Sequence, residues 1–524
     1  MRAKVLPTFV LLGALAATSA GCRTDSGNIQ AWGSKSQGPR KLVAVLTHEK
    51  YPTELRIEAA EMLISMKPRG GRRIGIQGTD EQPGLIDALA QMQPAARSAI
   101  VTRLVPKLQE EMLKPLPAAQ AGQAVADPTI PYKDAAFALL THEDGALLTD
   151  EALRKSLKTT LASWTATNFA DRLDDTSQMF GMEQVLRELK ADGVRSLPDL
   201  IVPGAAKIDR VSAMIADFGD DATKAKASDK LVAVAKEVNS DTWIKQKAPG
   251  VEAANKASKL SPTADQFKAQ LAKFQEEELM RVFASMKKVG GKPAVAFLLA
   301  FAQDKTQPEK RRGAAMAALQ GNLDKKDSAH AAAVLAVAGA ADTPDSVRDV
   351  ALQRVGELPR ALVIEKLYDL FKDPNWKVRW VAAELVLKMS ETPQLPEFFS
   401  KLAQADNMAI TEPLKYGQLI ANMKGTPPAV EVAEKYAAPG HPVQDRLAAL
   451  GYYYTVGTAA DLPKIASYTS DHTATPKCKA DAKDCDWKCD VQTDKGSETK
   501  EVTTLGDFVE HCVKPAMEKR KAAK

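Results

Sequence analysis

The sequence has no strong excess of charge, no long apolar segment beyond its first residues and few cysteines. Its 71 basic and 66 acidic side chains leave a formal charge of +5 over 524 residues. A nucleic-acid interface needs clustered bases, so we expect no nucleic-acid partner. The Gly-x-Ser-x-Gly and His-Glu-x-x-His motifs of two hydrolase classes are missing as well. We therefore expect no enzymatic activity, no catalytic residues and no cofactor.

The first 21 residues have the composition of a secretory signal peptide. Arg2 and Lys4 precede an apolar run at positions 5–17. Such a run is long enough for a signal peptide but too short to span a membrane. No later apolar stretch reaches the roughly 18 residues that a membrane helix needs. We predict that residues 1–21 are removed on export.

The end of this leader carries a recognisable cleavage motif, in which Ser19, Ala20 and Gly21 stand directly before Cys22. The arrangement resembles the lipobox of bacterial lipoproteins, with Ser19 in place of the usual leucine. The resemblance implies that Cys22 becomes the mature N-terminus, carries lipid and anchors the chain in the bacterial cell envelope. The residue after the cysteine is Arg23 and not aspartate, and in this the chain resembles lipoproteins that are exported to the outer membrane. The resemblance implies a location on the periplasmic face of that membrane or at the cell surface.

The rest of the chain divides by composition. Residues 22–40 are rich in serine, glycine, glutamine and asparagine, which predicts a flexible tether. From residue 41 onward alanine, leucine, valine, lysine and glutamate recur at helical spacing, so the predicted fold class is all-α. We assign residues 41–160 and 261–470 to repeated helix pairs, with Ser261 as the cap that opens the second block. Residues 161–260 are interpreted as a helical insertion or as diverged repeats.

A short helical motif recurs in both blocks. Residues 373–385 combine an Asp-Pro start with a Val-Arg pair and alanines, and residues 342–352 follow the same order. The aspartate is expected to cap the first amides of a helix, with proline at the first helical position. Looser copies surround Arg56, Arg312 and Arg446. The motif therefore predicts several equivalent helices along the chain.

The spacing of the motif indicates a repeat array. Arg312, Arg348 and Arg379 are 36 and 31 residues apart, a period typical of helical repeats. The pattern resembles HEAT repeats, which stack antiparallel helix pairs into an α-α superhelix. The resemblance implies that the motif residues bridge neighbouring repeats, and it assigns this inter-repeat role to Arg56, Arg312, Asp342, Arg348, Asp373, Arg379 and Arg446. A non-repetitive bundle of alanine-rich helices is the alternative.

Two further patterns raise the question of a ligand site. Residues 67–78 contain four glycines and four bases, and their backbone amides could cradle an anion. They lack the Lys-Ser/Thr ending of a phosphate loop, so a solvated loop is favoured. Leu-Thr-His-Glu occurs at residues 46–49 and again at 140–143, which could place His48 or His142 beside a glutamate as metal ligands. We favour a repeated turn at a helix end and predict no metal site.

Four cysteines, Cys478, Cys485, Cys489 and Cys512, lie within the last 47 residues. An even set in an exported chain is first interpreted as two disulfides. We predict a Cys489–Cys512 bond, with Cys478–Cys485 as its complement. The bonds would stabilise a small cap over residues 471–524, built from a hairpin and a following helix. Zinc bound by the same thiolates with His511 or His472 is the alternative, but the cysteine spacing does not match structural zinc sites.

Taken together, these features predict a scaffold of the cell envelope. The membrane is reached through the N-terminal lipid, and the repeat surface binds a protein partner whose identity the sequence does not define, as it does not define the oligomeric state. The alternatives are a periplasmic protein that binds a small ligand or a metal, and an enzyme with dispersed active-site residues.

Overall fold

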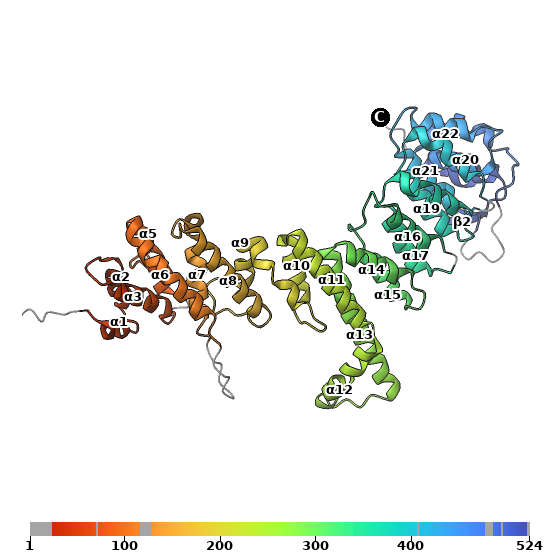
Figure 1. Cartoon of the computed structure of the whole chain (residues 1–524). Helices are drawn as coiled ribbons and strands as arrows, with labels where there is room; N and C mark the ends of the chain where they lie inside the picture. Colours follow the sequence, from red (N-terminus) through yellow and green to blue (C-terminus); the bar gives the residue numbers. More distant parts are fainter. Residues whose placement is uncertain are drawn as a thin grey trace, which may run out of the picture. The chain divides into compact units, whose positions relative to one another are not determined.

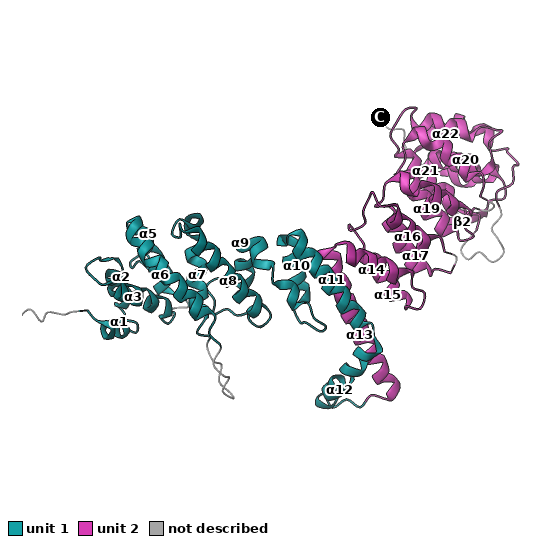
Figure 2. Cartoon of the chain, in the orientation of Figure 1, with its two compact units in different colours: residues 1–261 teal, residues 262–524 magenta. Residues whose placement is uncertain are grey.

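The computed structural model describes residues 24–69, 72–115, 127–340, 342–405, 408–476, 486–493 and 496–520. The predicted signal peptide, Cys22, Cys478 and Cys485 lie outside these ranges. Over the described residues the fold is all-α, as predicted, with a small two-stranded sheet near the C-terminus (Figure 1). The chain forms two compact units, residues 1–261 and 262–524 (Figure 2).

Unit 1 is built from helices that pack on their neighbours in the sequence. Contacts join α2 to α3, α6 to α7, and α8 to α9. The elements are α1 (Ser26–Trp32), α2 (Gly38–Thr47), α3 (Thr53–Ser65), α4 (Ile74–Gln77), α5 (Leu85–Gln91), α6 (Pro94–Met112), α7 (Ile130–Thr141), the 3₁₀ turn η1 (His142–Gly145), α8 (Glu151–Arg172), α9 (Met182–Val194), the 3₁₀ turn η2 (Leu197–Leu200), α10 (Ile208–Phe218), α11 (Asp221–Val238) and α12 (Asp241–Ala257).

The predicted tether is wrong for most of its described length, because α1 and the start of α2 lie within residues 24–40. The side chain of Asp25 accepts a hydrogen bond from the Asn28 amide (2.9 Å) and caps α1. Ile29 is fully buried, and α1 packs on α2 and α3. One cap and one buried isoleucine thus fix a segment whose composition suggests disorder.

The region between the two predicted repeat blocks is continuous with its surroundings. The predicted boundary at residue 160 falls inside α8, and α8 to α12 pack on one another in sequence order. The boundary at residue 261 coincides with the division between the two compact units. Thr263, rather than Ser261, caps the next helix, by accepting from the Gln266 amide (3.3 Å).

Unit 2 contains two rows of stacked helices. Contacts run from α15 to α17, α19, α21 and α23 in turn, and from α14 to α16 and α18. The elements are α13 (Ala264–Val289), α14 (Lys292–Gln303), α15 (Glu309–Ala318), α16 (Ser328–Gly339), α17 (Asp345–Val355), α18 (Arg360–Asp369), η3 (Leu370–Lys372), α19 (Trp376–Lys388), η4 (Thr392–Gln394), α20 (Leu395–Leu402), α21 (Thr411–Ala421), α22 (Ala429–Ala437), α23 (Val443–Val456), η5 (Ala459–Asp461), α24 (Leu462–Ile465), η6 (Ala466–Tyr468), β1 (Lys488–Thr493), β2 (Gly496–Glu501), α25 (Leu505–Phe508), the π-helical turn η7 (Val509–Val513) and α26 (Lys514–Glu518).

The closest helix packing in unit 2 joins α21 to α23. Gly417 and Gly451 face each other, and a β-carbon on Gly451 would collide with the carbonyl oxygen of Pro413. Glycine is needed here because the two backbones touch. The sequence of α21 has no Val-Arg pair, and yet this helix stacks between α19 and α23 like the other members of its row.

The C-terminal cap has the predicted hairpin and the predicted disulfide. β1 and β2 pair antiparallel, with Cys489 opposite Lys500. A disulfide joins Cys489 to Cys512, whose α-carbons are 5.7 Å apart, so zinc binding by these two thiolates is ruled out. The predicted single helix consists of α25, η7 and α26, and η7 and α26 pack on α23.

Candidate functional site

The five motif arginines occupy one position: each is the fourth residue of its helix. Each is buried and donates to a carbonyl at the end of the preceding helix. The bonds are Arg56 to Leu46 (2.8 Å), Arg312 to Ala302 (2.9 Å), Arg348 to Ala340 (2.7 Å), Arg379 to Asp373 (2.7 Å) and Arg446 to Ala437 (3.1 Å). These carbonyls have no acceptor role inside their own helix, so the arginines satisfy them.

This shared contact is different from the inter-repeat role that the resemblance implies. It lies inside a helix pair, where it fixes the turn between the two helices, rather than between neighbouring pairs. Two arginines also reach further: Arg379 pairs with Glu412 on α21, and Arg446 pairs with Asp471 in the segment after α23. All five motif arginines therefore stabilise the turn within their own helix pair, and two of them also form an ion pair beyond it.

The two motif aspartates do not cap helices as expected. Asp342 forms an ion pair with Lys305 (2.5 Å), which belongs to the turn of the preceding helix pair. The hydrogen bond from Lys305 lowers the pKa of Asp342. Asp373 accepts from the Asn375 amide (2.8 Å), and Asn375 itself caps α19 through the Lys377 amide (3.0 Å). The prolines of the motif accordingly precede the first helical position instead of occupying it.

The recurring Leu-Thr-His-Glu segments are turns. His48 and His142 are the C-cap residues that directly follow α2 and α7. The preceding threonines donate to the carbonyls four residues back, from Thr47 to Val43 and from Thr141 to Phe137, both at 2.9 Å. Among the described residues no group of three or more histidine, cysteine, aspartate or glutamate side chains could hold a metal ion.

The basic loop at residues 67–78 uses two of its arginines inside the fold. Arg69 donates to the carbonyl oxygens of Lys35 and Ser36. The guanidinium of Arg73 pairs with Asp134 (3.0 Å), which is fully buried together with Lys133. Asp134 also accepts two backbone amides from the loop before α9, so this ion cluster is compensated and holds the helices in place.

A groove on the row of unit 2 that contains α17, α19 and α21 is lined by two partly exposed tryptophan side chains. It has a volume of about 450 Å³ and is lined by α17, α19 and α21. We call it the aromatic groove, and its principal side chains are Asp345, Asp349 and Gln353 of α17, Trp376, Trp380 and Glu384 of α19, and Lys415 of α21. Side chains four residues apart share one face of a helix. The groove therefore has a polar wall on α17 and an aromatic wall on α19.

The aromatic wall is supported from within the fold. The indole of Trp380 stacks on the ring of Tyr416 at 5.9 Å between centroids. Tyr416 is buried and donates through its hydroxyl to Glu412 (2.9 Å), the carboxylate that Arg379 pairs with. The buried Arg379–Glu412 pair thus fixes the ring on which the groove's indole rests.

The polar wall carries negative charge. The Asp345 carboxylate has only long contacts: the side-chain amide nitrogen of Asn375 lies 3.4 Å away and the guanidinium of Arg348 lies 3.6 Å away. Partial burial and the neighbouring Asp345 carboxylate raise the pKa of Asp349. Glu384, at the far end of the opposite wall, is paired with Lys388 (2.5 Å).

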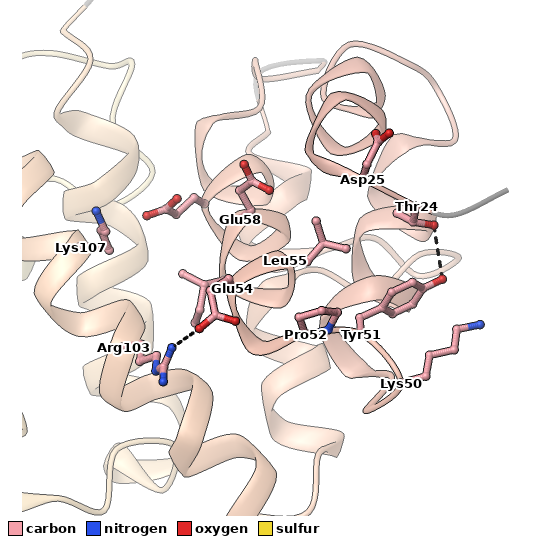
Figure 3. A pocket seen from close by; sticks show the side chains of 12 residues that line it. Thr24, Asp25, Lys50, Tyr51, Pro52, Glu54, Leu55, Glu58, Arg103 and Lys107 are labelled. Carbon is pink, nitrogen blue, oxygen red and sulfur yellow. Dashed lines mark hydrogen bonds and ion pairs between the residues drawn. The ribbon is translucent and has the colours of Figure 1, made fainter.

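A second groove, of about 1100 Å³, lies in unit 1 between α3 and α6 (Figure 3). Glu54, Glu58 and Glu61 follow one side of α3, opposite Arg103 and Lys107 of α6. An ion pair of 2.6 Å joins Arg103 to Glu54 across it. Burial raises the pKa of Glu61. A direct ion pair thus spans this groove, and no tryptophan side chain lines it.

A comparison of the chain with family models and with curated protein sequences finds no match. None of the described helices is both long enough and apolar enough to cross a membrane.

The aromatic groove was not predicted, although its signal is present in the sequence. Trp376 and Trp380 are four residues apart and flank the Val-Arg pair of the motif. A helix that buries Val378 and Arg379 turns both indoles to the same side, away from the buried face. Two large aromatic groups outside the face that carries the Val-Arg pair are the signal for an exposed aromatic surface.

Proposed function

We propose that this protein is a lipid-anchored scaffold of the cell envelope that binds protein partners through a HEAT-like repeat surface. The observation that carries the proposal is the aromatic groove. Tryptophan is enriched at the centres of protein interfaces, where it contributes much of the binding energy. Here Trp376 and Trp380 line an open groove along stacked helices instead of filling the core. The arginine at the fourth position of five helices supports the repeat assignment.

Attachment to the envelope rests on the leader and on Cys22. Acyl chains on this residue would hold the protein at a membrane, since each buried methylene contributes about 0.8 kcal/mol. The lipid and the groove then have separate tasks: the lipid localises the chain, and the repeat surface binds the partner.

Site-specific photocrosslinking in intact cells tests the binding role. A photoreactive residue at Gln353, in the groove, is expected to give a discrete adduct with another protein, which Trp376→Leu abolishes. The same photoreactive residue at Glu365, which is exposed on α18, is the control. Equal adducts at both positions, or none at Gln353, would contradict a partner in this groove.

A further inference from the structure

The two walls of the aromatic groove differ in chemistry. Asp345, Asp349 and Gln353 are spaced by four residues on α17, and Trp376 and Trp380 are spaced by four on α19. One wall therefore offers carboxylate oxygens and the other offers indole rings, across a hollow of about 450 Å³ that Lys377 and Lys415 also line. A hollow of this size accommodates a few side chains of a partner but not a folded element.

Carboxylates and indoles together bind organic cations. An indole face attracts an ammonium or guanidinium group through its quadrupole, and a carboxylate accepts charge-assisted hydrogen bonds from the same group. The chain shows this preference with its own residues. The ammonium of Lys415 lies 4.6 Å from the ring centroid of Trp380, and that of Lys377 lies 5.9 Å from the centroid of Trp376.

The carboxylates of the polar wall retain free acceptor capacity. Within the described residues, no hydrogen bond or ion pair engages Asp349, and the Asp345 contacts are 3.4 Å or longer. Both side chains are exposed, so a partner group can reach them. A cation that approaches the polar wall meets two exposed carboxylates: Asp345, whose one ion pair is the 3.6 Å contact with Arg348, and Asp349, which has no ion pair among the described residues.

We infer that the aromatic groove binds an arginine side chain of a protein partner, held between the Asp345–Asp349 wall and the indoles of Trp376 and Trp380. The inference rests on the proposed function and specifies its partner chemistry. Arginine fits better than lysine because its planar guanidinium stacks on an indole while it donates in a fork to a carboxylate. The occupant is thus a basic segment, not an acidic or apolar one.

Peptide binding to the full mature chain tests the inference. The probe is a fluorescent, terminally blocked Gly-Arg-Gly-Arg-Gly peptide, compared by anisotropy with the same peptide carrying citrulline, which keeps the shape of arginine without its charge. We expect the citrulline peptide to bind at least tenfold more weakly. The Asp345→Asn/Asp349→Asn protein should lose at least tenfold in affinity for the arginine peptide, and Trp376→Leu should lose affinity as well.

The matched control is Glu365→Gln/Asp369→Asn, which removes two exposed carboxylates from α18 and should change affinity less than twofold. Melting curves of the variants confirm that they are folded. Equal binding of the citrulline peptide, or an equal loss in the control, would overturn the inference. If crosslinks at Gln353 persist and depend on Trp376 while the arginine peptide does not bind, the partner chemistry is wrong and the proposed function stands. If the crosslinks fail as well, both are wrong.

Discussion

Arg379 and Glu412 form a two-point ion pair between α19 and α21, with Nη2 2.8 Å from Oε2 and Nε 3.2 Å from Oε1. Both side chains are buried. The Glu412 carboxylate also accepts from the Ala409 amide (2.6 Å) and from the Tyr416 hydroxyl (2.9 Å). One buried carboxylate thus connects two neighbouring helix pairs and the ring beneath the aromatic groove.

Arg379→Ala is expected to destabilise unit 2 by about 3 to 5 kcal/mol, because it leaves Glu412 buried without its countercharge. Denaturant unfolding measures the change. Arg379→Met combined with Glu412→Leu should recover much of the loss, since no charge is then stranded. Arg360→Ala, which breaks the more exposed pair with Glu397, is the control and should cost at most about 1 kcal/mol. Equal losses of stability in Arg379→Ala and Arg360→Ala would show that the buried ion pair contributes no more to stability than the more exposed one.

The repeat motif allowed much of unit 2 to be predicted, because its signal is local. Proline, a Val-Arg pair and alanines mark a helix start and a close-packed face within a few residues. The partner of each arginine could not be predicted in the same way. The carbonyl that it binds lies eight to ten residues back for Arg56, Arg312 and Arg348, at a helix end whose position the sequence gives only approximately.

The tether was predicted wrongly and the aromatic groove was not predicted at all, for a different reason. In α1, composition indicates disorder, yet Ile29 finds a buried site against other helices of unit 1, and tertiary packing outweighs the local preference. The aromatic groove depends on which faces of three separate helices turn outward together. Such a juxtaposition follows from stacking, and no single segment encodes it.

Asp445 is a buried carboxyl group at an apolar position of the array. It is the third residue of α23, where α17 and α19 carry the buried Val347 and Val378. Asp445 is 3% exposed, and its Oδ1 has no hydrogen-bond partner among the described residues. Burial raises the pKa of Asp445 from 3.8 to about 7.

We expect this group to make unit 2 less stable as the pH rises from about 4 to about 7. Over that range the native state keeps a proton on Asp445 that the unfolded chain has released, so deprotonation favours unfolding. Asp445→Val should raise the melting temperature at pH 8 by the equivalent of roughly 1 to 3 kcal/mol, the cost of an unpaired buried polar group. The gain should shrink at pH 5. Melting curves of wild type and variant at both values test this, and a gain independent of pH would contradict it.

Acylation of Cys22 is the direct test of the envelope anchor. Mass spectrometry of the membrane-extracted protein is expected to show an N-terminal peptide that begins at Cys22 and carries acyl chains. Cys22→Ser should leave the chain unanchored, because a protein without acyl chains loses the apolar transfer energy that holds it. Firm membrane retention of the Cys22→Ser protein would contradict the lipobox interpretation.

The Cys489–Cys512 bond is expected to hold the cap on the end of the repeat array. Its two cysteines are 23 residues apart, and closing a loop of this length stabilises the folded state by about 3 kcal/mol in the chain-entropy model. The bond ties β1 to η7, which contributes the buried Val509 and Val513 to the packing on α23. Reduction should therefore speed hydrogen exchange in residues 486–520 before it affects α15 to α19. Cys489→Ser/Cys512→Ser without reductant should reproduce this pattern. Free thiols at both positions in a non-reducing peptide map of the exported protein, or unchanged exchange after reduction, would show that packing alone holds the cap.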